Sequence, residues 1–289
     1  MSHPQATPAA ARDSATLVLL RDGADGLEVL LLRRHADSSV LGGVHVFPGG
    51  KLDAADCAPD ALALLDQDPA TLQHRLGQPD LAPEHAAGLF LAALREAHEE
   101  AGLLLATDAT PTALERLTAA RQGDTPLAEA MQSLALRWQV SAIEPWSRWV
   151  TPDHPAAGPR FDTRFFLAAL PADQQACHDG YEATEAVWLT PLRALQRHHA
   201  HEIALVPPQL MSLVQLLRHT DVASALAEAR ERVPPLVQPE RHDSGDERVL
   251  CYPGDPLHSV RERALRGPTR LRWLPRRFEP IGGFDAWFD

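Results

Sequence analysis

Arg95-Glu96-Ala97-His98-Glu99-Glu100-Ala101-Gly102-Leu103 is the stretch from which the rest of the chain can be interpreted. It closes a run that begins at Pro83, contains few helix breakers and has proline where the first residue of a helix favours it. On a helix, residues three and four apart lie on one face, so the carboxylates of Glu96, Glu99 and Glu100 come together. The stretch therefore predicts a helix from Pro83 to Ala101 with an acidic cluster near its end.

This acidic cluster has two interpretations. Like charges at these spacings cost roughly a few tenths of a kcal/mol per exposed pair, and only Arg95 and His98 lie nearby in sequence to relieve them. One interpretation is a solvated acidic face, on which His98 is a surface residue or, alternatively, a proton shuttle. The other is a site for a hard divalent cation such as Mg²⁺, which prefers oxygen ligands and keeps waters that a phosphate can displace.

A second segment, upstream of this helix, favours the metal site. It reads Val44-His45-Val46-Phe47-Pro48-Gly49-Gly50-Lys51-Leu52-Asp53-Ala54-Ala55-Asp56. Together the two segments resemble the box of the Nudix hydrolases, G-x5-E-x7-R-E-U-x-E-E-x-G-U. Gly50 takes the first position, and the later positions are taken by Arg95-Glu96, Glu99-Glu100 and Gly102-Leu103.

Two features of this box differ from the family pattern. Asp56 replaces the first glutamate, and 38 residues separate it from Arg95 where the family has 7, an insertion of 31. An interrupted box of this kind resembles the peroxisomal coenzyme A diphosphatase branch, although the final Phe288-Asp289 is not a peroxisomal S-K-L signal. The resemblance implies a pairing of Arg95 with the first acid, which the shorter Asp56 and the insertion leave open. The insertion, about residues 57–82, is either a lid or a cover for an apolar edge.

The resemblance also implies a set of metal ligands and catalytic groups. Mg²⁺ or Mn²⁺ would be held by the helix carboxylates, with Glu100 as the central ligand and Glu96 as ligand or base. A backbone carbonyl of the glycine turn would complete the set, because glycine lets the backbone approach a ligand closely. An acid in the loop before the strand that ends in Trp188-Leu189 would add a further ligand or the general base. The predicted residues are Glu96, Glu99, Glu100, Arg95, Gly49, Gly50 and Glu182, with Glu185 as the reserve for Glu182.

Four arginines are candidates for binding the phosphates of a substrate. Arg33 and Arg34 end an apolar run, where a polar rim is the alternative explanation. Arg160 and Arg164 are four apart on a predicted strand and therefore share a face. Arginine binds phosphate well because its guanidinium is weakly hydrated and forked. The alternative for this second pair is a salt bridge to Asp162 or another acid.

The fold that the resemblance implies is an α/β Nudix α/β/α sandwich with a mixed sheet. Residues 1–14 are predicted to be disordered, residues 15–233 to form the Nudix domain with its helical insertion, and residues 234–289 to form a C-terminal extension. Apolar runs bounded by turn residues predict a hairpin over residues 15–34. Two adjacent strands are predicted over residues 144–152 and 160–170, and two helices over residues 111–121 and 127–138.

The C-terminal extension differs in composition from the rest of the chain. It is irregular and rich in proline and arginine, with aromatic residues interspersed. We expect its aromatic residues to dock on its own domain or on a second subunit, which leaves a homodimer as one arrangement. Its arginines include Arg261, Arg263, Arg266, Arg270, Arg272, Arg276 and Arg277.

Bulk composition excludes several classes of function. The net charge of −12 argues against a nucleic-acid polymer as partner. Three widely spaced cysteines offer no disulfide framework and fit a reducing compartment. No apolar run approaches the roughly 18 residues of a membrane span, and the first residues lack a signal-peptide core. We therefore expect a cytoplasmic protein that acts on a small molecule.

These observations predict a metal-dependent hydrolase that cleaves the pyrophosphate of a nucleoside diphosphate linked to another moiety. Coenzyme A or an acyl-coenzyme A is the substrate that the branch resemblance implies. ADP-ribose, a nucleotide sugar or a dinucleotide is the alternative within the enzyme class. Outside it, the alternative is a Nudix module that binds a nucleotide without catalysis, although such modules usually lose box acids that this chain keeps.

Overall fold

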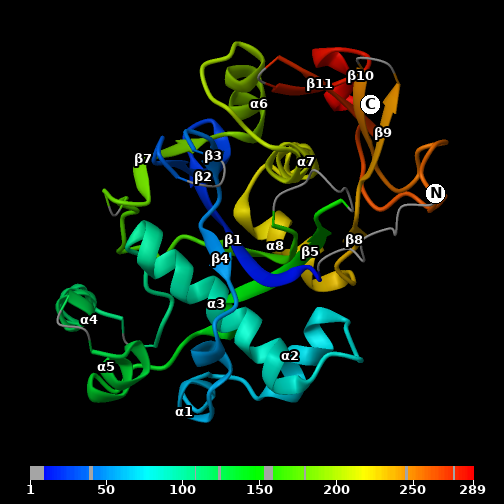
Figure 1. The fold of residues 1–289 in the computed structure, drawn as a ribbon. Helices are drawn as coiled ribbons and strands as arrows, with labels where there is room; N and C mark the ends of the chain where they lie inside the picture. The colour runs from blue at the N-terminus through cyan, green and yellow to red at the C-terminus, as the bar shows by residue number, and fades with distance from the viewer. Residues whose placement is uncertain are drawn as a thin grey trace.

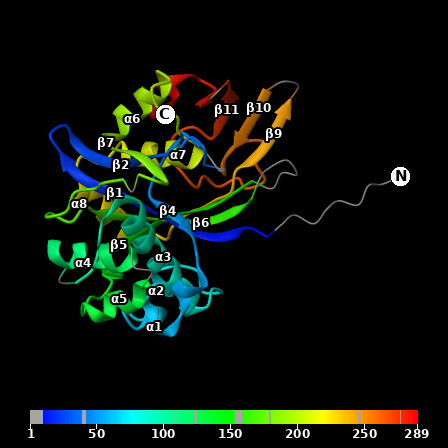
Figure 2. The ribbon, with the colours of Figure 1, turned by 60° about the vertical axis from the view of Figure 1, so that its left-hand side comes forward.

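The computed structural model describes residues 10–38, 42–107, 109–122, 125–152, 159–178, 180–244, 247–275 and 277–289. Its centre is a mixed sheet of eight strands between two layers of helices (Figures 1 and 2). This arrangement confirms the predicted α/β/α sandwich. The strands are β1 (Arg12–Gly23), β2 (Gly26–Arg34), β3 (His45–Val46), β4 (Gly49–Lys51), β5 (Ile143–Val150), β6 (Phe161–Ala169), β7 (Ala183–Leu189) and β8 (Leu236–Val237).

Strand β1 organises the sheet and separates the two hydrophobic cores. The order of strands is β3-β2-β1-β6-β5-β8, with β4 also paired to β1 and β7 to β2. The β1–β6 and β5–β8 pairs are parallel and the others are antiparallel. Because side chains alternate along a strand, Leu17 and Leu19 enter one core while Val18 and Leu20 enter the other. The hairpin predicted over residues 15–34 is β1 and β2, which meet at Gly23 and Gly26.

The first core lies under α3 (Pro83–Ala101), the helix predicted from the acidic stretch. Pro83 occupies its first turn, and Gly102 ends it with a φ of 67°, a left-handed conformation that glycine adopts without steric cost. The buried residues Leu91, Leu94 and Ala101 pack against the sheet. Also in this layer are η1 (Ala54–Cys57), α1 (Pro59–Leu62), α2 (Pro69–Leu76), α4 (Pro111–Gln122), α5 (Leu127–Ser133) and η2 (Val140–Ala142).

The insertion in the box forms α1 and α2, which pack beside α3. Asp68 caps α2 by accepting a 3.0 Å hydrogen bond from the Thr71 backbone N–H, and Gly77 ends it. Leu72 and Leu76 are buried in the same core as α3. The insertion therefore covers apolar surface, which is one of the two roles that the sequence left open.

The second predicted helix after α3 is shorter than expected. The prediction extended it to Trp138, but α5 ends at Ser133. Ala135 has a φ of 54°, which turns the chain. Trp138 then lies in the core, where its backbone N–H donates a 2.8 Å hydrogen bond to the carbonyl of Leu64. The apolar periodicity of this segment reflects burial of a turn rather than a longer helix.

The second core lies on the opposite face of the sheet and joins it to the C-terminal extension. Its helices are α6 (Pro191–His199), α7 (Pro207–Leu216) and α8 (Val222–Glu231). In the extension, β8 pairs with β5, and a separate antiparallel sheet has the order β12-β11-β10-β9. Trp287 and Leu271 are buried in the core that also contains α7. The remaining elements are β9 (Glu240–Ser244), β10 (Glu247–Cys251), β11 (Arg270–Leu274), β12 (Arg277–Pro280) and η3 (Phe284–Phe288).

Both ends of the chain contain more regular structure than the sequence predicted. Strand β1 begins at Arg12, inside the segment predicted to be disordered; residues 1–9 lie outside the described part. The extension, which appeared irregular from its composition, contains five short strands and docks on its own chain. Of its arginines, Arg276 lies outside the described residues. Within the described residues, no helix combines the length and the apolar character that crossing a membrane requires.

Candidate active site

Arg95 connects the two halves of the interrupted box. Its Nε donates to Asp56 Oδ1 at 2.9 Å and its Nη2 donates to Asp56 Oδ2 at 3.0 Å. A third hydrogen bond, at 3.0 Å, goes from Nη2 to the backbone carbonyl of Lys51. Asp56 is buried at 3% exposure and is held in turn by the Asp53 backbone N–H at 2.9 Å. The pairing that the insertion left open is therefore present, because η1 returns Asp56 to the helix.

The same guanidinium also holds two of the predicted carboxylates. Arg95 Nη1 donates to Glu96 Oε1 at 2.9 Å and to Glu99 Oε2 at 3.0 Å. Burial lowers the pKa of Arg95, but its bonds to Asp56 and the charges of these acids outweigh burial and raise it. Arg95 is thus a fixed cation that offsets the repulsion within the acidic cluster.

Glu100 is the most enclosed acid of the helix cluster, and its side chain is 7% exposed. Its Oε2 accepts a 2.9 Å hydrogen bond from the Gly49 backbone N–H, and its Oε1 lies 3.9 Å from Arg34 Nη1. Burial raises the pKa of Glu100 to about 8, with further increases from Glu96 and Glu182 and partial compensation from Gly49 and Arg34. A carboxyl in this environment is costly to ionise unless another cation joins it.

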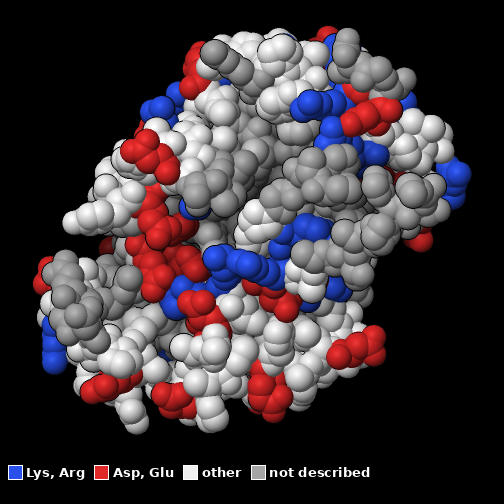
Figure 3. All heavy atoms as spheres, in the orientation of Figure 1, with Lys and Arg blue, Asp and Glu red and all other residues white. Residues whose placement is uncertain are grey.

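Glu182 belongs to the same site although it comes from a distant part of the chain. It directly precedes β7, and its charge raises the pKa of both Glu96 and Glu100. Its reserve, Glu185, has Oε2 3.7 Å from His45 Nε2 and lines a different cavity. Figure 3 shows acidic side chains gathered over the C-terminal half of α3, next to a band of lysine and arginine side chains. The structure therefore brings Glu182, but not Glu185, to the acidic cluster.

The two glycines of the turn are required by close approaches on either side. A Cβ on Gly50 would lie 2.1 Å from Glu96 Oε1, and a Cβ on Gly49 would lie 2.5 Å from the carbonyl oxygen of Ala15. Both distances are shorter than any ordinary contact. Glycine at both positions lets β4 pass between β1 and the carboxylates of α3.

The four predicted phosphate-binding arginines lie in different environments. Arg34 faces the acidic cluster, and within the described residues its buried Nε has no hydrogen-bond partner. Arg33 is exposed and lines a cavity on the opposite face of β2. Arg164 is 3% exposed and forms ion pairs with Asp13 and Asp162. Arg160 contacts the carbonyl of Thr151 at 3.4 Å. The ion pairs of Arg164 with Asp13 and Asp162 are the salt-bridge alternative. Arg164 is not brought to the acidic cluster.

Two features of the site were not anticipated from the sequence. His98 was expected on the surface, but it is 3% exposed because it follows Leu94 by four residues on the buried face of α3. The Lys51 carbonyl that accepts from Arg95 carries no sequence signal, because any residue has a backbone carbonyl. The capping pattern Asp53-Ala54-Ala55-Asp56, by contrast, is a signal that could have placed Asp56 at a turn.

The ligand chemistry of the cluster fits a hard divalent cation, although its side chains do not converge on one point as they stand. Carboxylate and carbonyl oxygens are the ligands that Mg²⁺ and Mn²⁺ prefer. Burial raises the pKa values of Glu96 and Glu100, so their charged forms are destabilised. A bound cation would offset that cost. Among the described residues, no group of three or more His, Cys, Asp or Glu side chains is arranged to hold a metal. Arg95 Nη1 instead donates to one oxygen each of Glu96 and Glu99, and the Gly49 N–H donates to one oxygen of Glu100.

One known protein family matches most of this chain. The family described as the NUDT19 Nudix domain matches residues 6–216, which is more than half of the chain. The chain belongs to the NUDT19 Nudix family. This membership confirms the predicted Nudix resemblance and the prediction of a hydrolase that cleaves a pyrophosphate. Nudix hydrolases generally need divalent metal ions, in agreement with the oxygen donors of the cluster.

Individual NUDT19 Nudix relatives resemble most of this chain. "Acyl-coenzyme A diphosphatase NUDT19" of Gallus gallus is 29% identical, and the match covers 84% of this chain and 79% of the relative. The protein of the same name from Homo sapiens is 28% identical over 81% and 73% of the two chains. Among solved structures, a NUDIX hydrolase from Alicyclobacillus acidocaldarius superposes with a TM-score of 0.58 at 28% identity, covering 75% of this chain and 96% of that one.

Proposed function

We propose that this protein hydrolyses the diphosphate of coenzyme A or of an acyl-coenzyme A, with Mg²⁺ or Mn²⁺ as cofactor. The observation that carries the proposal is the double role of Arg95, which joins Asp56 to Glu96 and Glu99 beside the buried Glu100. The names of the relatives from Gallus gallus and Homo sapiens support the choice of coenzyme A esters as substrate.

In this proposal Glu96, Glu99 and Glu100 hold the cation, together with a backbone carbonyl of Gly49 or Gly50. When bound, a divalent cation neutralises diphosphate charge and makes water more acidic. Arg95 is a positioning residue, because its hydrogen bonds orient Glu96 and Glu99 and keep the η1 turn against the helix. The protein contributes position and charge, which dominate phosphoanhydride hydrolysis.

Two further residues complete the proposed reaction. Arg34 binds a phosphate oxygen, because its guanidinium lies 3.9 Å from Glu100 and its Nε is buried with no hydrogen-bond partner in the described residues. Glu182 accepts the proton of the attacking water, with Glu96 as the alternative base. The exposed position of Glu182 at the edge of the cluster leaves it accessible to water.

The test is a substrate screen with purified protein, Mg²⁺ or Mn²⁺, and chromatographic identification of the products. Coenzyme A and acyl-coenzyme A should yield phosphopantetheine fragments and an adenosine bisphosphate faster than ADP-ribose, nucleotide sugars or dinucleotides are cleaved. Glu100→Gln should reduce turnover by orders of magnitude while the variant stays folded, with a melting temperature no lower than that of the wild type, because glutamine avoids the cost of ionising the buried carboxyl. Preferential cleavage of another compound would reassign the substrate, and full activity of Glu100→Gln would overturn the metal assignment.

We also propose that the enzyme works in a reducing compartment such as the cytoplasm, on a small molecule. Its three cysteines are free thiols, and its net charge of −12 supports a small-molecule partner over a nucleic-acid polymer. The aromatic residue Trp287 of the extension is buried against its own chain. A homodimer is therefore not needed to cover that anchor.

A further inference from the structure

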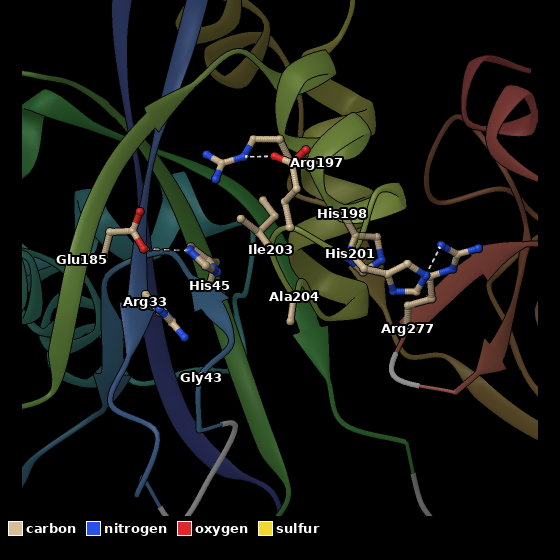
Figure 4. A pocket seen from close by; sticks show the side chains of 11 residues that line it. Arg33, Gly43, His45, Glu185, Arg197, His198, His201, Ile203, Ala204 and Arg277 are labelled. Carbon is tan, nitrogen blue, oxygen red and sulfur yellow. Dashed lines mark hydrogen bonds and ion pairs between the residues drawn. The ribbon is translucent and has the colours of Figure 1, made fainter.

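A second recess lies on the face of β2 opposite the acidic cluster. Because neighbouring side chains on a strand point to opposite faces, Arg34 faces Glu100 while Arg33 enters this recess. It is a cavity of about 540 Å³ between the ends of β2, β3 and β7 on one side and α6 on the other. Figure 4 shows Arg33, His45 and Glu185 on the strand side, and Arg197 and Arg277 on the side of α6 and the C-terminal sheet.

The wall of this cavity contains a buried polar side chain without a hydrogen-bond partner. His45 is 3% exposed, and within the described residues neither of its ring nitrogens makes a hydrogen bond. Glu185 Oε2 is 3.7 Å from His45 Nε2, which is too long for one. Burial lowers the pKa of His45, Glu185 raises it, and the charges of Arg33 and Arg197 lower it. A neutral ring offers one N–H donor, and leaving it unpaired is costly unless a ligand accepts a hydrogen bond from it.

The charged groups around His45 favour an anion. Three guanidinium groups line the cavity, against the two carboxylates of Glu185 and Glu202. Arg197 Nε donates to Glu202 Oε2 at 3.0 Å. Arg277 Nη1 lies 2.9 Å from His201 Nε2, and its Nη2 donates to Glu279 Oε2 at 2.9 Å. Within the described residues, Arg33 makes no ion pair. Arg197 and Arg277 are each held by an acid, so Arg33 is the lining cation of the described residues whose donors remain available to an anion.

We propose that this cavity binds a phosphate group. Arginine forks and an imidazole N–H match the oxygens of a phosphate, and they bind most strongly where burial has removed water. Two sources carry this chemistry. One is a further phosphate on the substrate itself, since Arg33 and Arg34 are consecutive residues at the end of β2, about 3.8 Å apart in Cα position. The other is free inorganic phosphate. The proposal concerns binding at the cavity and does not depend on the proposed hydrolysis.

The binding test is calorimetric titration of the full chain with inorganic phosphate in EDTA. Arg33→Gln and Arg197→Gln should each weaken binding about tenfold, the loss of one charged hydrogen bond. Arg193→Gln is the matched control, because Arg193 lies on the same helix as Arg197 but is exposed and does not line the cavity. Its affinity should equal that of the wild type. Circular dichroism melting of each variant separates lost binding from lost folding.

A second control separates the cavity from the acidic site, where phosphate could also bind. Arg34→Gln should leave the affinity for inorganic phosphate in EDTA unchanged. The proposal is overturned if Arg34→Gln abolishes binding while Arg197→Gln does not, or if the folded wild type binds no phosphate at millimolar concentration. In either case Arg197 and Arg277 serve only their acids, Glu202 and Glu279.

The source of the phosphate is decided by kinetics with two substrates. Coenzyme A and 3′-dephosphocoenzyme A share a diphosphate and differ by one phosphate monoester. If the substrate supplies the group, Arg197→Gln lowers kcat/KM about tenfold for coenzyme A alone. If the group is free phosphate, both substrates respond equally to Arg197→Gln, and binding of inorganic phosphate still depends on Arg33 and Arg197. Absence of hydrolysis with either compound would refute the proposed function and leave the binding test intact.

Discussion

Arg95 and Asp56 form a two-pronged ion pair across a gap of 38 residues in the sequence, with Nε–Oδ1 and Nη2–Oδ2 distances of 2.9 and 3.0 Å. The side chain of Arg95 is 12% exposed and that of Asp56 is 3% exposed. Because water has little access to either charge, each is stabilised by the other. The pair keeps the glycine turn, the η1 turn and the acidic end of α3 in one unit. An insertion between the two residues is tolerated because its helices α1 and α2 pack into the same core as α3.

Removing the charge of Asp56 should destabilise the fold. In Asp56→Asn, Arg95 loses a charged partner at a buried position, and we expect the free energy of unfolding to fall by about 2–3 kcal/mol. Turnover should fall too, because Arg95 also orients Glu96 and Glu99. The measurement is urea denaturation, with steady-state kinetics on the same samples.

Asp53 provides the matched control for Asp56. It lies 3.7 Å from the same guanidinium, but its side chain is 65% exposed. Asparagine also retains the ability to cap the η1 turn. Asp53→Asn should therefore change stability by less than about 1 kcal/mol. Equal losses for the two variants would show that the buried pair has no special role.

The enclosed carboxyl of Glu100 should make stability depend on pH when no divalent metal is present. Its pKa is about 8 in the folded protein against 4.5 for an ordinary glutamate. Between these values the folded state binds a proton that the unfolded state has lost. The stabilisation by this group is therefore complete below about pH 4.5 and is lost as the pH rises to about 8.

Glu100→Gln isolates this effect, since glutamine remains neutral throughout. From pH 5 to 8 in EDTA, the wild type should lose stability relative to Glu100→Gln, by at most about 1.4 kcal/mol per pH unit. Urea denaturation at each pH gives the comparison, and the exposed Glu115→Gln should follow the wild type. Parallel curves for wild type and Glu100→Gln would contradict the assigned burial cost.

Divalent cation binding should release protons from the acidic cluster. Burial raises the pKa values of Glu96 and Glu100, and both must be ionised to serve as ligands. Affinity for Mg²⁺ should thus increase between about pH 6 and 8, by up to about tenfold per unit for each proton released. Titration calorimetry in two buffers of different ionisation enthalpy measures the release. A pH-independent affinity, or one unchanged in Glu100→Gln, would place the cation elsewhere.

Arg34 and Arg164 should respond to substitution in opposite ways. Arg34→Gln should raise KM about tenfold with little change in melting temperature, because Arg34 faces Glu100 at 3.9 Å. Arg164→Gln should cost about 3–5 kcal/mol of stability and leave KM near the wild-type value, because Arg164 is buried between Asp13 and Asp162. The reverse result would exchange the roles assigned to these two arginines.

Local sequence was sufficient for the parts of this protein that depend on neighbouring residues. The helix from Pro83 to Ala101 follows from its apolar spacing and its end at Gly102, and the hairpin of β1 and β2 follows from two apolar runs with a glycine-rich turn. The gathering of Glu96, Glu99 and Glu100 on α3 also follows directly from helical spacing. The motif then identified the family without any knowledge of the tertiary structure.

The sequence did not predict where long-range partners lie. His98 could be placed on a helix, but its burial depends on which face of α3 meets the sheet. The composition of the extension concealed strands that are stabilised by pairing and by the burial of Trp287. In the same way, only tertiary packing assigns Arg164 to Asp13 and Arg34 to Glu100.

The sequence by itself determined the secondary structure around the acidic helix, the family and the chemical type of the ligands, because these depend on residue spacing and side-chain chemistry. Only the tertiary structure decided that Asp56 reaches Arg95, that Glu182 rather than Glu185 joins the cluster, and that Arg33 enters a separate cavity. The physical reason is that contacts between distant segments depend on the packing of the sheet and its helices as a whole, which no local pattern encodes.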